Sequence, residues 1–116
     1  MRKQNTLKRR VEFKGKGLHS GKIGTVTLKP APEDTGYLFV FNDKRSKEYV
    51  PFSIDSVVDT RNNISISNGK VVIKTVEHLL AALYGLRVDN CIIDIDTTEV
   101  PIMDGSSSEF VQGILD

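Results

Sequence analysis

The sequence predicts an α+β fold, a two-layer sandwich in which a mainly antiparallel sheet is covered on one face by two helices. Short strand-like segments follow one another through the first part of the chain, and the order then becomes helix, strand, helix. An Asn68-Gly69 pair between two apolar runs is typical of a two-residue hairpin turn, which joins antiparallel strands. A parallel α/β sheet would instead alternate strands with helices along the whole chain.

Length and composition indicate one globular domain. A chain of 116 residues can bury a single hydrophobic core, so we expect residues 1–116 to form one domain. Its hydrophobic and charged fractions, 39% and 27%, are ordinary for a folded protein and argue against disorder. The single cysteine, Cys91, excludes an internal disulfide and a cysteine-rich metal site. It lies in an apolar run, where a buried and inert thiol is expected.

Charge is spread unevenly although the formal net charge is only +1. Eight basic residues fall within the first 22 positions, against the single acidic residue Glu12. They form either the exposed face of an edge strand, where lysines oppose edge-to-edge pairing, or a basic patch for an anionic ligand. The first residues lack the apolar core of a signal peptide, and no apolar run is long enough to span a membrane. We therefore expect a cytoplasmic location.

Alternation of apolar and polar residues locates the strands. The segment 37–42 alternates most clearly, and the Ile92-Ile93 pair predicts burial on both faces of its strand. Pro51 and scattered charges predict a connection after residue 43, ahead of the segment 56–60. Strands are expected over residues 4–14, 25–29, 37–42, 64–66, 71–73 and 88–96.

The first helix is predicted around residues 75–83, with Thr75 as its N-cap and Gly85 as the residue just beyond its end. At about 100° per residue its aliphatic side chains converge on one face, which should cover the sheet. His78 points roughly opposite, flanked on its own side by Ala81 and Ala82. We therefore expect another surface to approach this second face of small residues. The apolar face consists of Val76, Leu79, Leu80 and Leu83.

A second helix is predicted after the turn Asp104-Gly105-Ser106. The segment Ser106-Ser107-Ser108-Glu109 matches a capping box, and Phe110, Val111 and Ile114 form the apolar face that follows. The sequence stops inside this helix, with neither a cap nor a polar tail.

The Glu77-His78 pair is the first candidate for chemistry. Adjacent helical residues point about 100° apart, so they do not bind one ion together as histidines four residues apart do. They can instead surround one reaction centre, with the imidazole holding a metal and the carboxylate taking a proton from water. The alternative is a surface histidine without a role.

His19 is the second candidate, because it lies in a stretch with three glycines in seven residues, 15–21. Glycines permit positive φ angles and close approach of the backbone to another group. His19 is therefore either held near a ligand or an ordinary turn residue. Asp104 is fully explained as part of a turn before a helix.

Four motifs stand in order along the chain: Gly15-Lys16-Gly17-Leu18-His19-Ser20-Gly21, Asp59-Thr60, Thr75-Val76-Glu77-His78-Leu79 and Pro101-Ile102-Met103-Asp104-Gly105-Ser106. Each is weak alone. Together they closely resemble, in order and spacing, the N-terminal half of the zinc-dependent UDP-3-O-acyl-N-acetylglucosamine deacetylase family of lipid A biosynthesis. The resemblance covers nearly all of the chain.

The resemblance implies roles for the matching residues. His78 would be one zinc ligand, and Glu77 the general base that deprotonates the attacking water. His19 would lie at the rim of the active site near the substrate, and Thr60 would line the same cleft. Asp104 would be a motif residue without an assigned role. The implied fold has two similar α+β domains whose helical faces pack together around the cleft.

A catalytic zinc site needs three protein ligands, and the resemblance places the others in a second, C-terminal domain. We therefore expect an N-terminal domain whose partners are that C-terminal domain and a UDP-linked, acylated glucosamine. On its own it should be inactive, with an incomplete Zn²⁺ site. It is either an excised piece or the natural partner of a separately encoded half.

A competing hypothesis is a non-catalytic module that binds RNA or another acidic partner through its basic N-terminal strand. The nearly neutral net charge and the lack of an aromatic stacking pattern weigh against it.

Overall fold

The structure is a computed structural model that describes residues 3–59 and 63–116. Its larger sheet has five strands in the order β1-β2-β8-β3-β4, and a smaller sheet has three in the order β5-β6-β7. The elements are β1 (Val11–Lys16), β2 (Ile23–Pro30), β3 (Tyr37–Asn42), β4 (Lys47–Pro51), the 3₁₀ helix η1 (Ile54–Ser56), β5 (Val57–Asp59), β6 (Ser65–Ser67), β7 (Val72–Ile73), α1 (Glu77–Gly85), β8 (Cys91–Ile95) and α2 (Ser108–Leu115).

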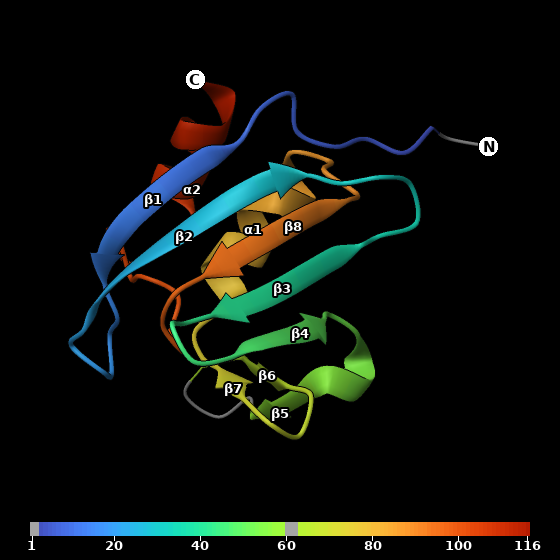
Figure 1. The fold of residues 1–116 in the computed structure, drawn as a ribbon. Coiled ribbons are helices and arrows are strands. Elements are labelled where there is room, and N and C mark those ends of the chain that lie inside the picture. The colour runs from blue at the N-terminus through green and yellow to red at the C-terminus, as the bar shows by residue number, and fades with distance from the viewer. Residues whose placement is uncertain (1–2, 60–62) are drawn as a thin grey trace.

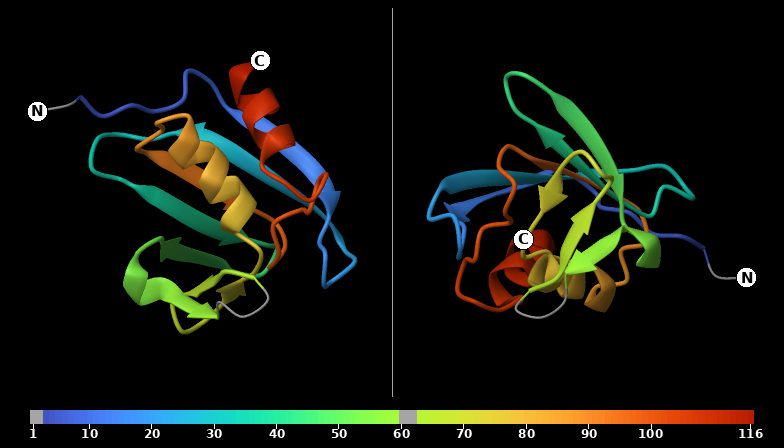
Figure 2. Two further views of the ribbon diagram at one scale, coloured as in Figure 1. Left: turned by 180° about the vertical axis from the view of Figure 1, so that it is seen from behind. Right: turned by 90° about the horizontal axis from the view of Figure 1, so that it is seen from below.

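Both helices lie on the same face of the five-stranded sheet, behind it in Figure 1 and in front of it in the left view of Figure 2. Three of its four strand pairings are antiparallel, and only β3 and β8 run parallel. The predicted α+β fold is therefore confirmed. The separate small sheet beside β4 was not expected (Figure 1).

Strand register separates a buried face from an outer face. One row across the sheet joins Val11, Leu28, Ile93, Phe39 and Val50, each at most 8% exposed, and it forms the floor of the core beneath the helices. Since side chains alternate along a strand, the neighbouring row faces away from the helices. Burial of this one face supplies the main stabilisation of the sheet.

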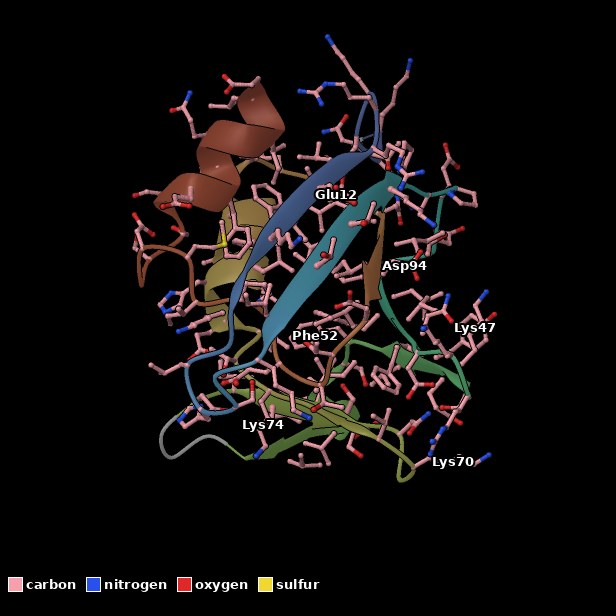
Figure 3. All side chains as sticks on the ribbon, turned by 60° about the vertical axis from the view of Figure 1, so that its left-hand side comes forward. Glu12, Lys47, Phe52, Lys70, Lys74 and Asp94 are labelled. Atoms are coloured by element: carbon pink, nitrogen blue, oxygen red, sulfur yellow. The ribbon has the colours of Figure 1, made fainter. Side chains whose placement is uncertain are left out.

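The outer row contains charged and polar groups. It includes Glu12 and Asp94, labelled in Figure 3, together with Thr27 between them. Lys29 forms an ion pair with Asp94 across this face. Ile92, on the same side of β8, is half-buried while Ile93 is fully buried, so the expected two-sided burial is only partial.

β1 is an edge strand, and it begins at Val11 and not at the predicted residue 4. β2 continues for two residues beyond Leu28, the partner of Val11, but Lys29 and Pro30 pair with β8 and not with the residues before Val11. Among residues 3–10, Thr6 makes an isolated bridge, to Asn90. Lys14 on β1 is exposed, as expected for a charged strand at a sheet edge.

β4 lies where the sequence predicted only a connection. Its charged residues and its proline suggested a loop, but both are tolerated on an edge strand. Val50 is fully buried, while Pro51 is the last residue of the strand, where its missing N–H interrupts little pairing. β3, in contrast, has the predicted bounds 37–42.

The β6–β7 hairpin is confirmed, but its loop is longer than the two residues predicted. Ile66 pairs with Ile73, and residues 68–71 connect the strands. Gly69 has a φ of +93°, and the Asn68 side chain accepts hydrogen bonds from the N–H groups of Lys70 and Val71. The Asn68-Gly69 pair therefore forms a turn stabilised by the asparagine side chain.

α1 buries the predicted aliphatic face, but both of its ends differ from the prediction. Thr75 does not cap the helix, because its φ is +63° and its hydroxyl bonds elsewhere; Val76 takes the N-cap position. At the other end Arg87, not Gly85, has the positive φ, +60°. The N–H of Arg87 donates to the Tyr84 oxygen, and that of Val88 to Leu83, as in a Schellman motif.

The expected small-residue face of α1 is only half correct. Ala81 is exposed beside His78, but Ala82 is 1% exposed and belongs to the core. α1 packs against α2 as well as against the sheet, which widens its buried arc.

α2 is anchored by one aromatic side chain. Phe110 is fully buried and meets Phe13 edge to face, with ring centroids 4.9 Å apart. A Cβ on Gly113 would lie 2.5 Å from the Phe13 ring, so this turn of the helix needs a glycine. The predicted capping box is wrong: Ser107 is the N-cap and makes no side-chain capping bond.

Two remaining expectations concern Cys91 and membrane crossing. Burial raises the pKa of the Cys91 thiol to about 12, which agrees with an inert side chain. Among the residues that the structure describes, neither helix is long and apolar enough to cross a membrane.

Replacing Phe110 with alanine should lower the free energy of unfolding by about 3–5 kcal/mol, because it leaves a cavity between α2 and β1. Leu115→Ala on the same helix is the control: that side chain is 66% exposed and should change stability by less than about 0.5 kcal/mol. Urea unfolding followed by far-UV circular dichroism measures both. Equal effects of the two substitutions would contradict the proposed anchoring role of Phe110.

Candidate functional site

Three segments meet at the end of the large sheet where β1 and β8 end and α1 begins (Figure 1). They are the β1–β2 loop, the link from β7 to α1, and the segment that follows β8. Backbone hydrogen bonds join them: the Lys74 N–H donates to Thr98 at 2.8 Å, that of Val100 to Lys74 at 3.0 Å, and that of Ile102 to Lys16 at 2.7 Å. Three of the four sequence motifs lie in or next to these segments: those of residues 15–21, 75–79 and 101–106.

The carboxylate of Glu99 lies at the centre of this junction and is 2% exposed. Oε1 accepts hydrogen bonds from the N–H of Ser20 at 2.8 Å and of His19 at 3.1 Å. Oε2 accepts from the same His19 N–H at 3.0 Å, from the Thr75 hydroxyl at 2.9 Å, and contacts His19 Nδ1 at 2.8 Å. One buried side chain thus binds the β1–β2 loop and the start of α1 together.

Burial by itself would raise the pKa of the Glu99 carboxyl. The hydrogen bonds from Ser20, from the backbone and ring of His19 and from Thr75 outweigh burial and lower the pKa to about 2. Glu99 is therefore ionised at neutral pH. Its buried negative charge is stabilised by the hydrogen-bond donors of His19, Ser20 and Thr75.

The glycines of the β1–β2 loop have the two uses predicted for them. Gly21 has a φ of +68°. A Cβ on Gly17 would lie 2.4 Å from Glu99 Oε1, so the close backbone approach predicted for this loop is an approach to Glu99. His19 itself is held by that carboxylate while its side chain remains 41% exposed.

Thr75 connects this junction to the Glu77-His78 pair. Its φ of +63° is rare for a β-branched residue, and such strain persists only where the surroundings impose it. The hydrogen bond from its buried hydroxyl to Glu99 is one such constraint. The chain direction that results starts α1 two residues later, at Glu77.

Glu77 and His78 are both half-buried in the first turn of α1. In the part of the chain that the structure describes, Oε1 of Glu77 is buried and has no hydrogen-bond partner. Buried polar atoms without partners are uncommon because they lose their contact with water without replacement. Among the described residues, Oε1 of Glu77 is therefore an acceptor without a partner, on the residue that directly precedes His78.

Asp104, another predicted site residue, is not part of this network. Asp104 is exposed, and its Oδ1 accepts hydrogen bonds from the N–H and hydroxyl of Ser106 at 3.1 and 3.0 Å, which stabilises a turn. Thr60 lies outside the described residues.

Comparison with known proteins shows the family of this chain. The family model described as "LpxC: UDP-3-O-acyl N-acetylglycosamine deacetylase" matches residues 4–116. The chain belongs to this family. A UDP-3-O-acyl-N-acetylglucosamine deacetylase of Anaeromyxobacter sp. is 48% identical over 108 residues, which are 93% of this chain and 35% of that protein. One from Actinobacillus pleuropneumoniae serotype 3 is 46% identical over 117 residues, 100% of this chain and 38% of that protein.

A longer relative is the "Bifunctional enzyme LpxC/FabZ" of Chlorobaculum tepidum, 46% identical over 112 residues. They cover 97% of this chain but only 24% of that enzyme. The chain therefore spans between a quarter and two fifths of the length of these LpxC relatives.

A complete metal site is not among the described residues. Across residues 3–59 and 63–116, no group of three or more His, Cys, Asp or Glu side chains is placed to hold a metal ion. His78 is available as one nitrogen ligand, which is fewer than the three that a catalytic zinc site takes from protein.

Sequence reasoning missed Glu99, although it detected the loop and the helix that Glu99 joins. The available signal was a lone carboxylate between Thr98 and the apolar Val100-Pro101 pair, since charged residues are rarely buried unless paired. Its partners are 24 to 80 residues away in sequence, so no local pattern predicts them.

Replacing Glu99 with glutamine should flatten the acid dependence of stability. The pKa in the folded chain, about 2, lies below the ordinary 4.5, so the stabilisation is complete above about pH 5 and is lost as the pH falls toward 2. A shift of this size corresponds to roughly 3 kcal/mol. Urea unfolding at a series of pH values should show a smaller change for Glu99→Gln than for the parent chain.

The exposed Glu33 provides the control for this series. Glu33→Gln should reproduce the parent's pH dependence, because the remaining carboxylates titrate equally in both. If the Glu99→Gln curve runs parallel to that of the parent, Glu99 does not hold its charge in the folded state.

Proposed function

We propose that this chain is the N-terminal part of a deacetylase that removes the N-acetyl group from UDP-3-O-acyl-N-acetylglucosamine in lipid A biosynthesis. The observation that carries the proposal is the first turn of α1, where Glu77 directly precedes His78 and has a buried oxygen without a hydrogen-bond partner among the described residues. Membership of the LpxC family and the names of the relatives support the substrate and the reaction.

The residues of this chain fit one part of a zinc site. Neutral imidazole is a common zinc ligand. His78 would hold the ion from this side. The remaining ligands would come from the part of the enzyme that lies outside this chain, which we infer to be a C-terminal domain packed against α1. Bound zinc lowers the pKa of water to about 7 and polarises the amide carbonyl.

Glu77 performs the proton transfer in this proposal. Oε1 takes a proton from the water that attacks the acetamide carbon, and the proton that the leaving amine needs would come from an acid in the part of the enzyme outside this chain. An acceptor already engaged in a hydrogen bond would first have to break it, whereas no residue within 3–59 or 63–116 donates a hydrogen bond to Oε1. The products are acetate and the free amine of the sugar nucleotide.

The Glu99 junction serves this chemistry by fixing the start of α1. Thr75 is held in a strained backbone conformation by the Glu99 carboxylate, and Glu77 follows two residues later. A rigid support keeps the general base at a constant distance from its substrate, on which proton transfer depends steeply.

The decisive experiment replaces Glu77 with alanine in the complete protein. Loss of the proton acceptor should lower kcat by about 10²–10⁴-fold, with a much smaller change in KM. Glu33→Ala, an exposed carboxylate on the same chain, should leave turnover unchanged. Steady-state release of acetate measures both variants. Turnover of the Glu77 variant within about threefold of the parent would reject this role.

His78 has a different signature. His78→Ala in the complete protein should lower the zinc content per chain, because one of about three protein ligands is removed. Glu77→Ala should retain the metal, since in this proposal Glu77 contacts water and not the ion. Elemental analysis after dialysis distinguishes the two, and an unchanged zinc content in His78→Ala would rule out ligation.

A further inference from the structure

We propose that Glu99 is a positioning residue for His19: it keeps Nδ1 of the ring as a hydrogen-bond donor, so that Nε2 is the atom His19 presents to a ligand. A neutral His19 then offers an acceptor for a hydroxyl or amide N–H group of a sugar-like ligand. The identity of that ligand rests on the proposed function, whereas the assignment of the ring atoms rests only on the contacts around Glu99.

The carboxylate determines which ring nitrogen carries the proton. An ionised carboxylate only accepts hydrogen bonds, and Nδ1 lies 2.8 Å from Glu99 Oε2. A lone pair on Nδ1 would face the negative oxygen, so the neutral ring must place its proton there. Glu99 is ionised at neutral pH because its pKa is about 2. Protonation of the ring leaves Nδ1 unchanged and adds the second proton at Nε2.

Backbone contacts fix the ring relative to the carboxylate. The N–H of His19 donates to both oxygens of Glu99, and the N–H of Ser20 donates to Oε1. Backbone and ring of the same residue therefore bind one carboxylate, which leaves the His19 side chain little torsional freedom. Gly17 closes the loop over Oε1, with no room for a Cβ. The ring is nevertheless 41% exposed, so part of it faces outward.

A purely structural role for Glu99 predicts something different. If Glu99 only fastened the β1–β2 loop, its bonds to the backbone of His19 and Ser20 would be enough, and the ring would be free to adopt either tautomer. If Glu99 only fastened the loop, the contact between its Oε2 and His19 Nδ1 would have no function. The tautomer of His19 therefore separates the two roles.

The first test is the tautomer of His19 in the whole 116-residue chain, labelled with ¹⁵N. The sequence has two histidines, so the imidazole spectrum contains only two rings, and His78→Gln assigns them. At about pH 9, where histidine is neutral, we expect the His19 proton on Nδ1. A proton on Nε2 in the parent chain would overturn the proposal, and this measurement needs no variant of Glu99 to fold.

Glu99→Gln should reverse the tautomer. The two backbone N–H groups require an acceptor, so the glutamine carbonyl oxygen turns toward them and its NH₂ group faces Nδ1, which must then accept. Thr75→Val is the matched control, because it removes a different donor from Oε2 and should leave the proton on Nδ1. An unchanged tautomer in a folded Glu99→Gln chain would overturn the assignment to Glu99.

The second test measures KM in the complete protein by a double-mutant cycle. His19→Asn retains a donor near the position of Nδ1 but has no atom at the position of Nε2. His19→Gln has a polar atom near the position of Nε2 but none at that of Nδ1. We expect His19→Asn to raise KM several-fold more than His19→Gln does. Glu99→Gln should raise KM in the parent but add nothing in the His19→Asn background.

The outcomes separate this inference from the proposed function. An equal effect of Glu99→Gln in both backgrounds would assign Glu99 a structural role only and overturn the inference. Loss of the expected Glu77 and zinc results would reject the deacetylase proposal, yet the tautomer measurement would still decide the role of Glu99.

Discussion

The buried carboxylate of Glu99 is the constraint on which the arrangement of this site depends. An ionised group at 2% exposure is tolerable only because donors surround it, and those donors come from the β1–β2 loop and from the residue before α1. Satisfying one charge therefore fixes two backbone segments that are far apart in sequence. The strained φ of Thr75 and the close approach of Gly17 both follow from the same requirement. The position of Glu77 and His78 is a consequence of it.

Much of the fold follows from local patterns, and the exceptions have physical causes. Alternation located β3 with its observed bounds, and helical periodicity located the buried face of α1, because both patterns reflect burial against a single core. Thr75 has the chemistry of an N-cap, but a carboxylate 24 residues away binds its hydroxyl instead. β4 was missed because an edge strand tolerates the charges and the proline that usually mark a loop. Secondary-structure propensity reflects interactions with neighbours in sequence, whereas the conformations of Thr75 and β4 depend on partners that are distant in sequence.

The candidate site was predictable to the same extent. The Glu77-His78 pair lies on adjacent residues, so helical geometry and acid–base chemistry made it a candidate, and its proposed role came from the family resemblance. The glycines around His19 correctly indicated a close approach, but the sequence did not show to what. Glu99 gave almost no local signal, since its importance lies in four donors that only the folded chain assembles. The residues proposed to perform chemistry were thus easier to select from the sequence than the residue that anchors the segments around them.

The central position of β8 has a consequence for how the chain reaches this structure. β8 lies between β2 and β3, so the hairpins β1–β2 and β3–β4 have no direct contact within the sheet and are joined by a strand that follows both of them in the sequence. A nascent polypeptide that stops before Cys91 therefore holds two separate hairpins with exposed apolar faces. Closure of the sheet is a long-range event, and topologies of this kind fold slowly. During synthesis, the hydrophobic face beneath the helices stays open until β8 has emerged from the ribosome.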